Sequence, residues 1–271
     1  MNASWNRQLL CALLGVTAGC VSPATRPPAP AAATAAVAAA PAPATPVYFS
    51  DGQLDSTALI EPPPAAGSDA ARADLRAVLD AQRTAHASGT TARAVGDTVI
   101  DCQRVAEVLT PALPAKGDGA AAVEFATRAA RQASVAAGAP KRYWARPRPY
   151  IVSAAVERLG DVAPDSPLAI NGGYERDHTS YPSGHTTFGT ACAIVLAQMV
   201  PEQRAALFER ARLYGESRLI VGAHFPTDVD AGRRVGTAAA GVMLRNPQFQ
   251  ADLRAARAQL RGALGLPQIA P

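Results

Sequence analysis

Apolar residues recur at helical spacing along most of the chain, and short breaks rich in proline and glycine separate the segments. In the first segment, Leu75, Val78 and Leu79 share one face. Ser68, just before it, is a residue type that caps helix N-termini. A half-buried strand requires alternating apolar and polar residues, and no such pattern of useful length is present. The pattern therefore predicts an all-α protein.

Six more helices are expected, at residues 95–109, 120–137, 185–199, 201–220, 227–244 and 247–263. Pro111 follows the first of these, and Gly138 and Pro140 end the second, because proline and glycine disfavour a helix interior. Prolines near the starts of three later segments are compatible with helix, since a missing N–H costs little in the first turn. We therefore expect a single compact multi-helix domain over residues 48–271.

Residues 1–20 have the features of a bacterial export signal, and residues 21–47 those of a linker. Arg7 precedes an apolar run over residues 9–16, which is shorter than a membrane span requires. The run leads into Thr-Ala-Gly-Cys, which resembles a lipobox, so either Cys20 is lipidated or an ordinary signal peptidase cleaves further on. The linker is almost wholly Ala, Pro and Thr and cannot bury a core. Either route predicts a periplasmic protein, soluble or tethered to the envelope by a lipid.

Composition narrows the class of protein. Hydrophobic residues make up 48% of the chain and aromatic residues only 5%, so alanine, leucine and valine must fill the core. The net charge of +4 is mild and no Lys/Arg run is present, so nucleic-acid binding is not expected. No apolar run reaches the roughly 18 residues of a membrane span, so membrane contact is expected only through the N-terminal lipid. Cys102 and Cys192 form either a disulfide, which an exported compartment permits, or two buried thiols.

The first of three polar segments runs from Lys141 to Pro149 and is dense in cations. An isolated stretch of this kind is usually a solvated face. Here the flanking prolines hold Arg146 and Arg148 in an extended segment after a helical region. The planar guanidinium of Arg148 can then bind phosphate oxygens, while Lys141 adds a point charge.

The second segment, Tyr181–Thr186, contains Pro-Ser-Gly-His, an order that suits a turn opening a helix. Ser183 supplies a hydroxyl, and Gly184 lets backbone N–H groups approach an anion at the helix N-terminus. His185 would lie beside that anion and is a candidate proton donor. The ordinary alternative is a surface turn with an incidental histidine.

The third segment, Ser217–Asp228, places a histidine between two helices. Arg218 ends one helix, and His224 falls on the joint before the next. Asp228 lies four residues after His224 in the first turn of the next helix, where the helix dipole favours a carboxylate. It is expected to accept the Nδ1 proton of His224 and to leave Nε2 as a nucleophile. An isolated His-x-x-x-Asp is usually an ordinary polar pair.

Together, the three segments supply the groups that phosphoryl transfer needs, with no metal or cofactor. The residues expected to bind phosphate are Lys141, Arg148, Ser183, Gly184 and Arg218. The residues expected to be catalytic are His224, His185 and Asp228.

The combination Lys-x6-Arg-Pro, Pro-Ser-Gly-His and Ser-Arg-x5-His-x3-Asp, over residues 141–228, resembles the signature of the type 2 phosphatidic acid phosphatase (PAP2) superfamily, which also contains the vanadium haloperoxidases. The chain's size, its export signal, its lack of an expected membrane span and its Ser-Tyr-Pro-Ser-Gly-His-Thr run resemble the class A bacterial non-specific acid phosphatases. Thr179 stands where that subfamily usually has glycine, which bears on loop shape and substrate preference.

The resemblance implies a helical-bundle fold and an exported acid phosphatase that hydrolyses small phosphate monoesters through a phosphohistidine. His224 would attack phosphorus, His185 would protonate the leaving alkoxide, and Asp228 would orient His224. A homo-oligomer is implied by resemblance alone. The alternatives are a vanadate-dependent haloperoxidase, a soluble lipid-phosphate phosphatase, and a phosphate-binding protein with a decayed site.

An acidic optimum is expected, because His185 must start protonated and the second phosphate pKa is about 6. Nearby cations should lower the pKa of His185, and bound phosphate should raise it. Specificity is expected to depend on residues 153–180, in which Tyr174, Asp177 and His178 have no assigned contacts.

Overall fold

The computed structural model describes residues 46–109, 117–162 and 178–269. Its α-helices are α1 (Ser56–Leu59), α2 (Asp69–Ser88), α3 (Thr91–Gly96), α4 (Gln103–Ala106), α5 (Asp118–Ser134), α6 (Gly138–Trp144), α7 (Pro149–Val152), α9 (Gly184–Met199), α10 (Arg204–Ile220), α11 (Pro226–Met243) and α12 (Pro247–Ala263). Three short 3-10 turns are η1 (Val135–Ala137), η2 (Gly160–Val162) and η3 (Pro201–Gln203). The described residues form no β-sheet, so the prediction of an all-α fold is confirmed.

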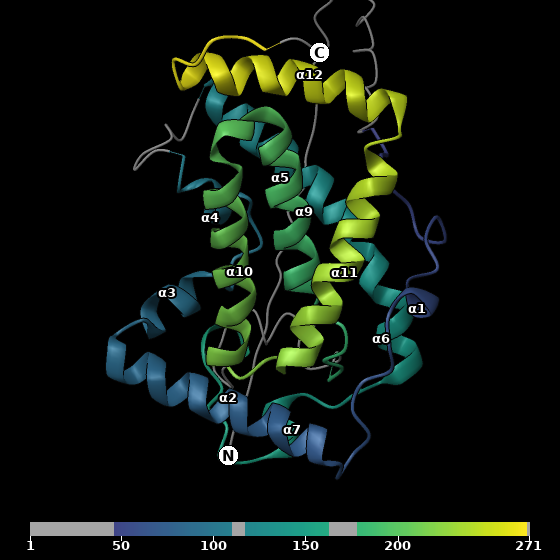
Figure 1. Cartoon of the computed structure of the whole chain (residues 1–271), viewed down its shortest axis with the longest axis vertical. Coiled ribbons are helices and arrows are strands. Elements are labelled where there is room, and N and C mark those ends of the chain that lie inside the picture. The colour runs from purple at the N-terminus through teal and green to yellow at the C-terminus, as the bar shows by residue number, and fades with distance from the viewer. Residues whose placement is uncertain (1–45, 110–116, 163–177, 270–271) are drawn as a thin grey trace, which may run out of the picture. The chain divides into compact units, whose positions relative to one another are not determined.

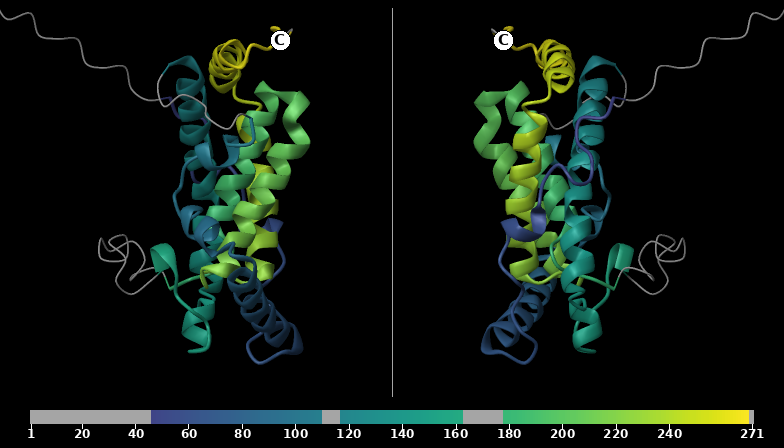
Figure 2. Two further views of the ribbon diagram at one scale, coloured as in Figure 1. Left: turned by 90° about the vertical axis from the view of Figure 1, so that its left-hand side faces the viewer. Right: turned by 90° about the vertical axis from the view of Figure 1, so that its right-hand side faces the viewer.

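Helix α9 forms the centre of the core and packs against α5, α10 and α11 (Figures 1 and 2). Almost every residue of α9 is buried, because its sequence is apolar or small on all sides. Gly232 of α11 lets the two helices meet closely, since a Cβ there would lie 2.5 Å from the backbone oxygen of Ser183. The N-terminus of α9 is therefore packed directly against the first turns of α11.

Two helices lie across the ends of this bundle (Figure 1). Helix α12 packs on α5 and α9 at one end, where Phe249 stacks with Phe125, and Tyr48 meets both rings edge-on. Helix α2 contacts α10 and α11 at the other end. Ser68 caps α2 by accepting a hydrogen bond from the amide of Ala71, as the sequence predicted.

The last four predicted helices are confirmed to within a few residues as α9, η3 followed by α10, α11 and α12. The helix predicted at 95–109 is wrong, because the chain leaves helical structure after Gly96 and resumes it at Gln103. The segment between α3 and α4 contains Asp97, which is buried and paired with Arg210 of α10. A buried ion pair thus overrides the apolar spacing that favoured a continuous helix.

The helix predicted at 120–137 also differs, because Gly138 and Pro140 do not end the helical region. The chain passes from α5 through η1 directly into α6. Pro140 is the third residue of α6, where a backbone N–H has no intrahelical partner to lose. Helix α6 instead ends after Trp144, and Ala145 follows in the left-handed conformation with φ 45°.

Cys102 and Cys192 form a disulfide, with their Cα atoms 5.6 Å apart, which decides between the two alternatives left open by the sequence. The bond links the start of α4 to α9. The expected export signal, Cys20 and residues 21–45 of the linker lie outside the described residues, as do Tyr174 and Asp177. Within the described part of the chain, none of the helices has the length and hydropathy needed to cross a membrane.

Candidate active site

The three polar segments meet at the end of the bundle where α10 leads into α11, near α2 (Figure 1). Lys141 lies in the last turn of α6, and Arg218 in the last turn of α10. A pocket of about 330 Å³ opens at this point. Predicted site residues that line it are Lys141, Arg148, Gly184, His185 and His224.

Arg148 contacts the candidate nucleophile directly. Its Nη1 donates to the backbone oxygen of Ala223 at 3.0 Å and lies 3.3 Å from Nε2 of His224. A guanidinium can only donate, so Nε2 is the unprotonated nitrogen of the imidazole in this arrangement. Nε2 therefore carries the lone pair that a nucleophile needs, and His224 lines the pocket together with Arg148.

Asp228 lies on the opposite side of His224. Its Oδ2 is 3.5 Å from Nδ1 of His224, and Nδ1 makes no hydrogen bond, so the predicted hydrogen bond is not formed in this structure. Oδ2 instead accepts from the Phe225 amide at 2.8 Å, and Oδ1 accepts from Arg146 at 2.7 Å. These two donors hold the carboxylate of Asp228 in the first turn of α11, within reach of Nδ1 after a small movement.

Burial and charge both act on the titration of this pair. Burial, followed by the positive charges of Arg148 and Lys141, holds the pKa of His224 well below its usual range. The ring is therefore neutral near pH 7. Burial also raises the pKa of Asp228, while Arg146 and the Phe225 amide act in the opposite direction.

His185 lies on another wall of the pocket, at the start of α9. Its Nε2 is 3.0 Å from the backbone oxygen of Thr98 and 3.9 Å from a carboxylate oxygen of Asp161. Burial, and then the charge of Arg218, lowers the pKa of His185 to about 3, although Asp161 and the Thr98 carbonyl oppose this shift. The sequence argument named the cations but missed burial, which is the larger cause.

Ser183 has a structural role that was not predicted from the sequence. Its Oγ caps α9 by accepting from the amide of Thr186 at 3.2 Å, and it also accepts from the Thr186 hydroxyl at 2.9 Å. The Ser183 amide donates to the backbone oxygen of Asp228 at 2.9 Å. The turn that carries Gly184 and His185 is thus joined to the first turn of α11, so the second and third segments are placed relative to each other.

Thr179 occupies the position where the resembling subfamily usually has glycine. Its backbone oxygen accepts from Nζ of Lys141 at 2.9 Å, and it pairs with Pro147 in an isolated antiparallel bridge. Thr179 is not among the described residues with positive φ, so no steric reason requires glycine here. His178, which precedes it, has an exposed side chain.

Arg146, Thr98 and Asp161 contact predicted site residues, and Asp74 contacts Arg146, but none of the four was assigned a role from the sequence. One signal for Asp74 was present. It shares the buried face of α2 with Val78 and Ala85, at spacings of four and seven residues, and a carboxylate on such a face is normally paired. Asp161 gave no comparable signal, because it precedes a segment with no helical periodicity. Its partner Arg218 is 57 residues away in sequence.

A family model described as the PAP2 superfamily matches residues 122–252, which include all three polar segments. The non-specific acid phosphatase of Salmonella typhimurium is 30% identical over 220 residues, 79% of this chain and 84% of that protein. The acid phosphatase of Zymomonas mobilis is 31% identical over 132 residues, 46% of this chain and 44% of that protein. The non-specific acid phosphatase of Providencia stuartii is 44% identical over 78 residues, 29% of this chain and 32% of that protein.

Proposed function

We propose, from the premise that the chain belongs to the PAP2 superfamily and is related within it to the bacterial non-specific acid phosphatases, that it hydrolyses phosphate monoesters. One observation carries this proposal. Nε2 of a neutral, buried His224 opens on a pocket that is lined by two cations and by a second histidine. Such a site attracts a phosphate dianion and offers it a nucleophile.

In the proposed first step, Nε2 of His224 attacks phosphorus, and a P–N bond forms while the ester P–O bond breaks. Lys141, Arg148 and Arg218 bind the phosphoryl oxygens, together with the Gly184 amide at the N-terminus of α9. The negative charge of Asp228 stabilises the positive charge that develops on the imidazole of His224.

The leaving alkoxide takes its proton from His185. Because Nε2–H of His185 donates to the Thr98 carbonyl, the transferred proton would sit on Nδ1. Phosphate binding supplies the negative charge that opposes burial and Arg218, so His185 is protonated mainly in the substrate complex. In the second step, water gives a proton back to His185 and attacks phosphorus, the P–N bond breaks, and phosphate leaves. This step order favours activity at acid pH.

The test uses the full-length protein with p-nitrophenyl phosphate over a range of pH, with and without EDTA. We expect a rate maximum below pH 7, no effect of EDTA, and loss of activity in His224→Ala. His86→Ala is the matched control, because His86 is an exposed histidine on α2 that pairs with Glu157. Loss of activity on chelation would rule out the metal-free mechanism, and a maximum at alkaline pH would contradict the role of His185.

A direct test of the intermediate is to quench the reaction with alkali and look for acid-labile phosphate on the protein. We expect label on wild type and on Asp228→Asn, at different rates, and none on His224→Ala. Label that persists in His224→Ala would place the nucleophile elsewhere.

Export is part of the proposal and rests on residues 1–20. Cell fractionation should find activity in the periplasm or envelope. Cys20→Ser distinguishes the two forms, since only a lipoprotein would be released from the envelope by this change. Activity confined to the cytoplasm would overturn the export proposal without affecting the chemistry.

A further inference from the structure

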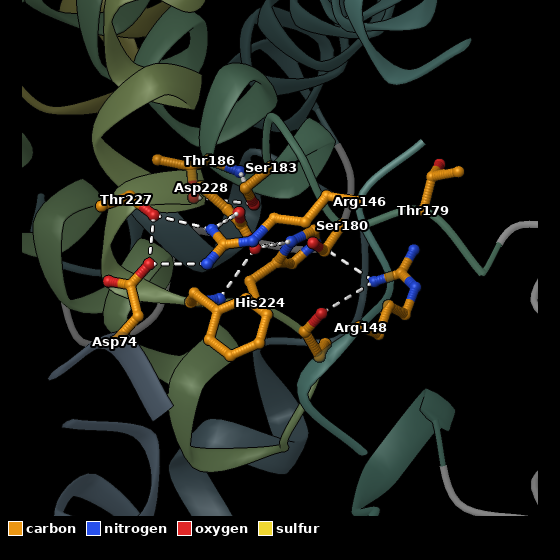
Figure 3. A network of polar contacts seen from close by, with 12 residues as sticks. Asp74, Arg146, Arg148, Thr179, Ser180, Ser183, Thr186, His224, Thr227 and Asp228 are labelled. Carbon is orange, nitrogen blue, oxygen red and sulfur yellow. Dashed lines mark hydrogen bonds and ion pairs between the residues drawn. The ribbon is translucent and has the colours of Figure 1, made fainter. Parts of the chain in front are cut away.

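Arg146 is a buried cation between two buried carboxylates, those of Asp74 and Asp228 (Figure 3). Its Nη1 donates to Oδ1 of Asp228 at 2.7 Å, and its Nη2 donates to Oδ2 of Asp74 at 2.7 Å. Nη1 also donates to Thr227 at 2.7 Å, and the Thr227 hydroxyl donates to Asp74. The guanidinium lies 4.0 Å from the ring centre of Phe225. These four partners hold the guanidinium, and Arg146 also lines a separate cavity of about 350 Å³ beside the Phe225 ring.

Arg146 and Arg148 lie two residues apart but serve opposite sides of His224. Arg148 lines the pocket, whereas Arg146 is not among its lining residues. The segment is extended, as shown by the hydrogen bond from the Ser180 amide to the Arg146 oxygen at 2.8 Å and by the one from the Arg148 amide to the His178 oxygen at 3.2 Å. Side chains two apart in a straight strand share a face, yet these two guanidiniums end at different partners, Asp228 for Arg146 and Nε2 of His224 for Arg148.

The charges in this cluster do not cancel. Asp74 and Asp228 contribute two negative charges, and Arg146 contributes one positive charge. The result is a net negative charge in a buried site. One of its oxygens, Oδ2 of Asp228, lies 3.5 Å from Nδ1 of His224. At this distance and burial, an unbalanced charge acts strongly on a neighbouring imidazole. Its sign favours the positive charge that develops on His224 when Nε2 bonds to phosphorus.

We propose that Asp74 and Arg146 are positioning residues for the nucleophile, which act through Asp228. Arg146 orients the Asp228 carboxylate toward Nδ1 of His224. Asp74 shares the positive charge of Arg146, so Arg146 does not neutralise Asp228 completely and the cluster stays negative. This proposal rests on the proposed function, because it concerns the reactivity of His224. It assigns neither residue a contact with substrate.

The variants Asp74→Asn, Arg146→Lys and Arg146→Met test this assignment in the full-length enzyme. We expect kcat to fall by roughly 10- to 100-fold, as is usual when the partner of a directly acting residue is removed. Competitive inhibition by inorganic phosphate should stay within about threefold, because the pocket cations are untouched. Arg146→Lys should lose less than Arg146→Met, since it keeps the charge but not the two-pronged geometry.

The matched controls are Asp230→Asn and Arg233→Met, which remove an exposed ion pair on α11 with the same substitutions. A spectroscopic readout separates positioning from simple destabilisation. Nitrogen-15 NMR of labelled histidine should show His224 protonated at Nδ1 in wild type and a mixture of tautomers in Arg146→Met.

A double variant keeps the proposal falsifiable even if Arg146→Met folds poorly. Asp74→Asn combined with Arg146→Met leaves Asp228 as the single charge of the cluster, so the net charge stays negative. We expect this protein to recover folding and part of kcat relative to Arg146→Met. The proposal is overturned if all variants keep wild-type kcat, or if inhibition by inorganic phosphate weakens as much as kcat falls. Absence of any phosphatase activity in wild type would instead refute the proposed function.

A different observation points to the substrate's leaving group. Beyond the two cations, the two histidines and Gly184, the described residues that line the pocket are apolar except for one serine: Ile100, Ser134, Val135, Ala137, Gly138 and Phe188. Ile100 and Val135 are large aliphatic side chains, yet they are 40% and 44% exposed. The Ser134 hydroxyl already donates to the backbone oxygen of Arg131 at 2.7 Å. This side of the pocket therefore offers apolar surface and few polar groups to a ligand.

We infer that this apolar wall, formed by Ile100, Val135 and Phe188, binds the leaving group and favours phosphate monoesters of alkyl or aryl alcohols over those of polyols. An apolar group would cover the exposed aliphatic surface. A polyol would lose hydration there without gaining hydrogen-bond partners. This inference rests on the proposed function and deepens it.

Hexyl phosphate and glycerol 3-phosphate test it, because both leaving groups are alkoxides. We expect kcat/KM to favour hexyl phosphate by at least about tenfold. Val135→Ser and Ile100→Ser should reduce this ratio severalfold and leave inhibition by inorganic phosphate unchanged. Val108→Ser is the control, since Val108 is exposed but does not line the pocket. Equal turnover of both substrates would overturn the inference, whereas turnover of neither would refute the proposed function itself.

Discussion

The two sides of His224 differ in how their charges are arranged. On the pocket side, Lys141 and Arg148 line the cavity, and Arg218, which pairs with Asp161, adds a third positive charge that lowers the pKa of both histidines. On the other side, Arg146 stands between Asp74 and Asp228, so negative charge is in excess. We call the pocket side of His224 the front and the Asp228 side the rear. The positive front attracts phosphate, and the negative rear stabilises a positively charged imidazole. The contrast teaches that one histidine can be neutral before the reaction and stabilised as a cation during it.

Removal of a front cation should have the largest effect. Arg148→Met removes a phosphate ligand that also contacts Nε2 of His224. We expect kcat/KM to fall by about 100- to 1000-fold, with inhibition by phosphate weakened in parallel. Arg146→Met should lower kcat without weakening that inhibition. Steady-state kinetics of both variants with phosphate as inhibitor tests the comparison, and equal behaviour would show that front and rear do not differ in this way.

Loss of the disulfide should disturb the segments that line the pocket more than the cluster of Asp74, Arg146 and Asp228. Cys102 follows the segment that carries the Thr98 carbonyl and Ile100, and Cys192 lies on α9 with His185. We expect Cys102→Ala combined with Cys192→Ala to lower the free energy of unfolding by about 2–5 kcal/mol. Denaturant unfolding measures this, and reduced wild type is the matched comparison. An unchanged unfolding midpoint would contradict it.

Asp161→Asn should make the front more positive. Asp161 raises the pKa of His185, so its removal lowers that pKa further. The alkaline limb of the pH–rate profile, which reports loss of the acid proton, should move to lower pH. Phosphate should inhibit more strongly, because Asp161 no longer competes for Arg218. A profile that moves to higher pH would contradict the role given to His185.

The smallest expected effect concerns stability against pH. The folded pKa values of His185 and His224 lie below the unfolded value of 6.5. Below about pH 6.5 the unfolded state binds more protons, so stability falls with falling pH, for His185 down to about pH 3. Above that window these groups contribute no pH dependence. Bound phosphate should reduce the slope, and unfolding curves with and without phosphate measure it. A steeper slope with phosphate would contradict this account.

The sequence predicted helices best over the last four segments, where apolar spacing is continuous and proline lies near three of the starts. These segments are α9 to α12, and α12 was predicted within its observed bounds of Pro247–Ala263. The prediction was wrong between Gly96 and Gln103, where the buried pair of Asp97 and Arg210 turns the chain. Asp97 and Arg210 are 113 residues apart in sequence, so no local pattern could reveal that they pair.

The sequence by itself determined the all-α class and the three segments that carry Lys141, Arg148, Ser183, Gly184, His185, Arg218, His224 and Asp228. Short-range spacing sufficed, because helix periodicity and these motifs are local properties. Tertiary structure alone decided what surrounds Arg146. Asp74, brought from α2 against the first turn of α11, joins Asp228 and Thr227 around its guanidinium. A long-range contact of this kind follows from packing, and packing depends on the whole chain.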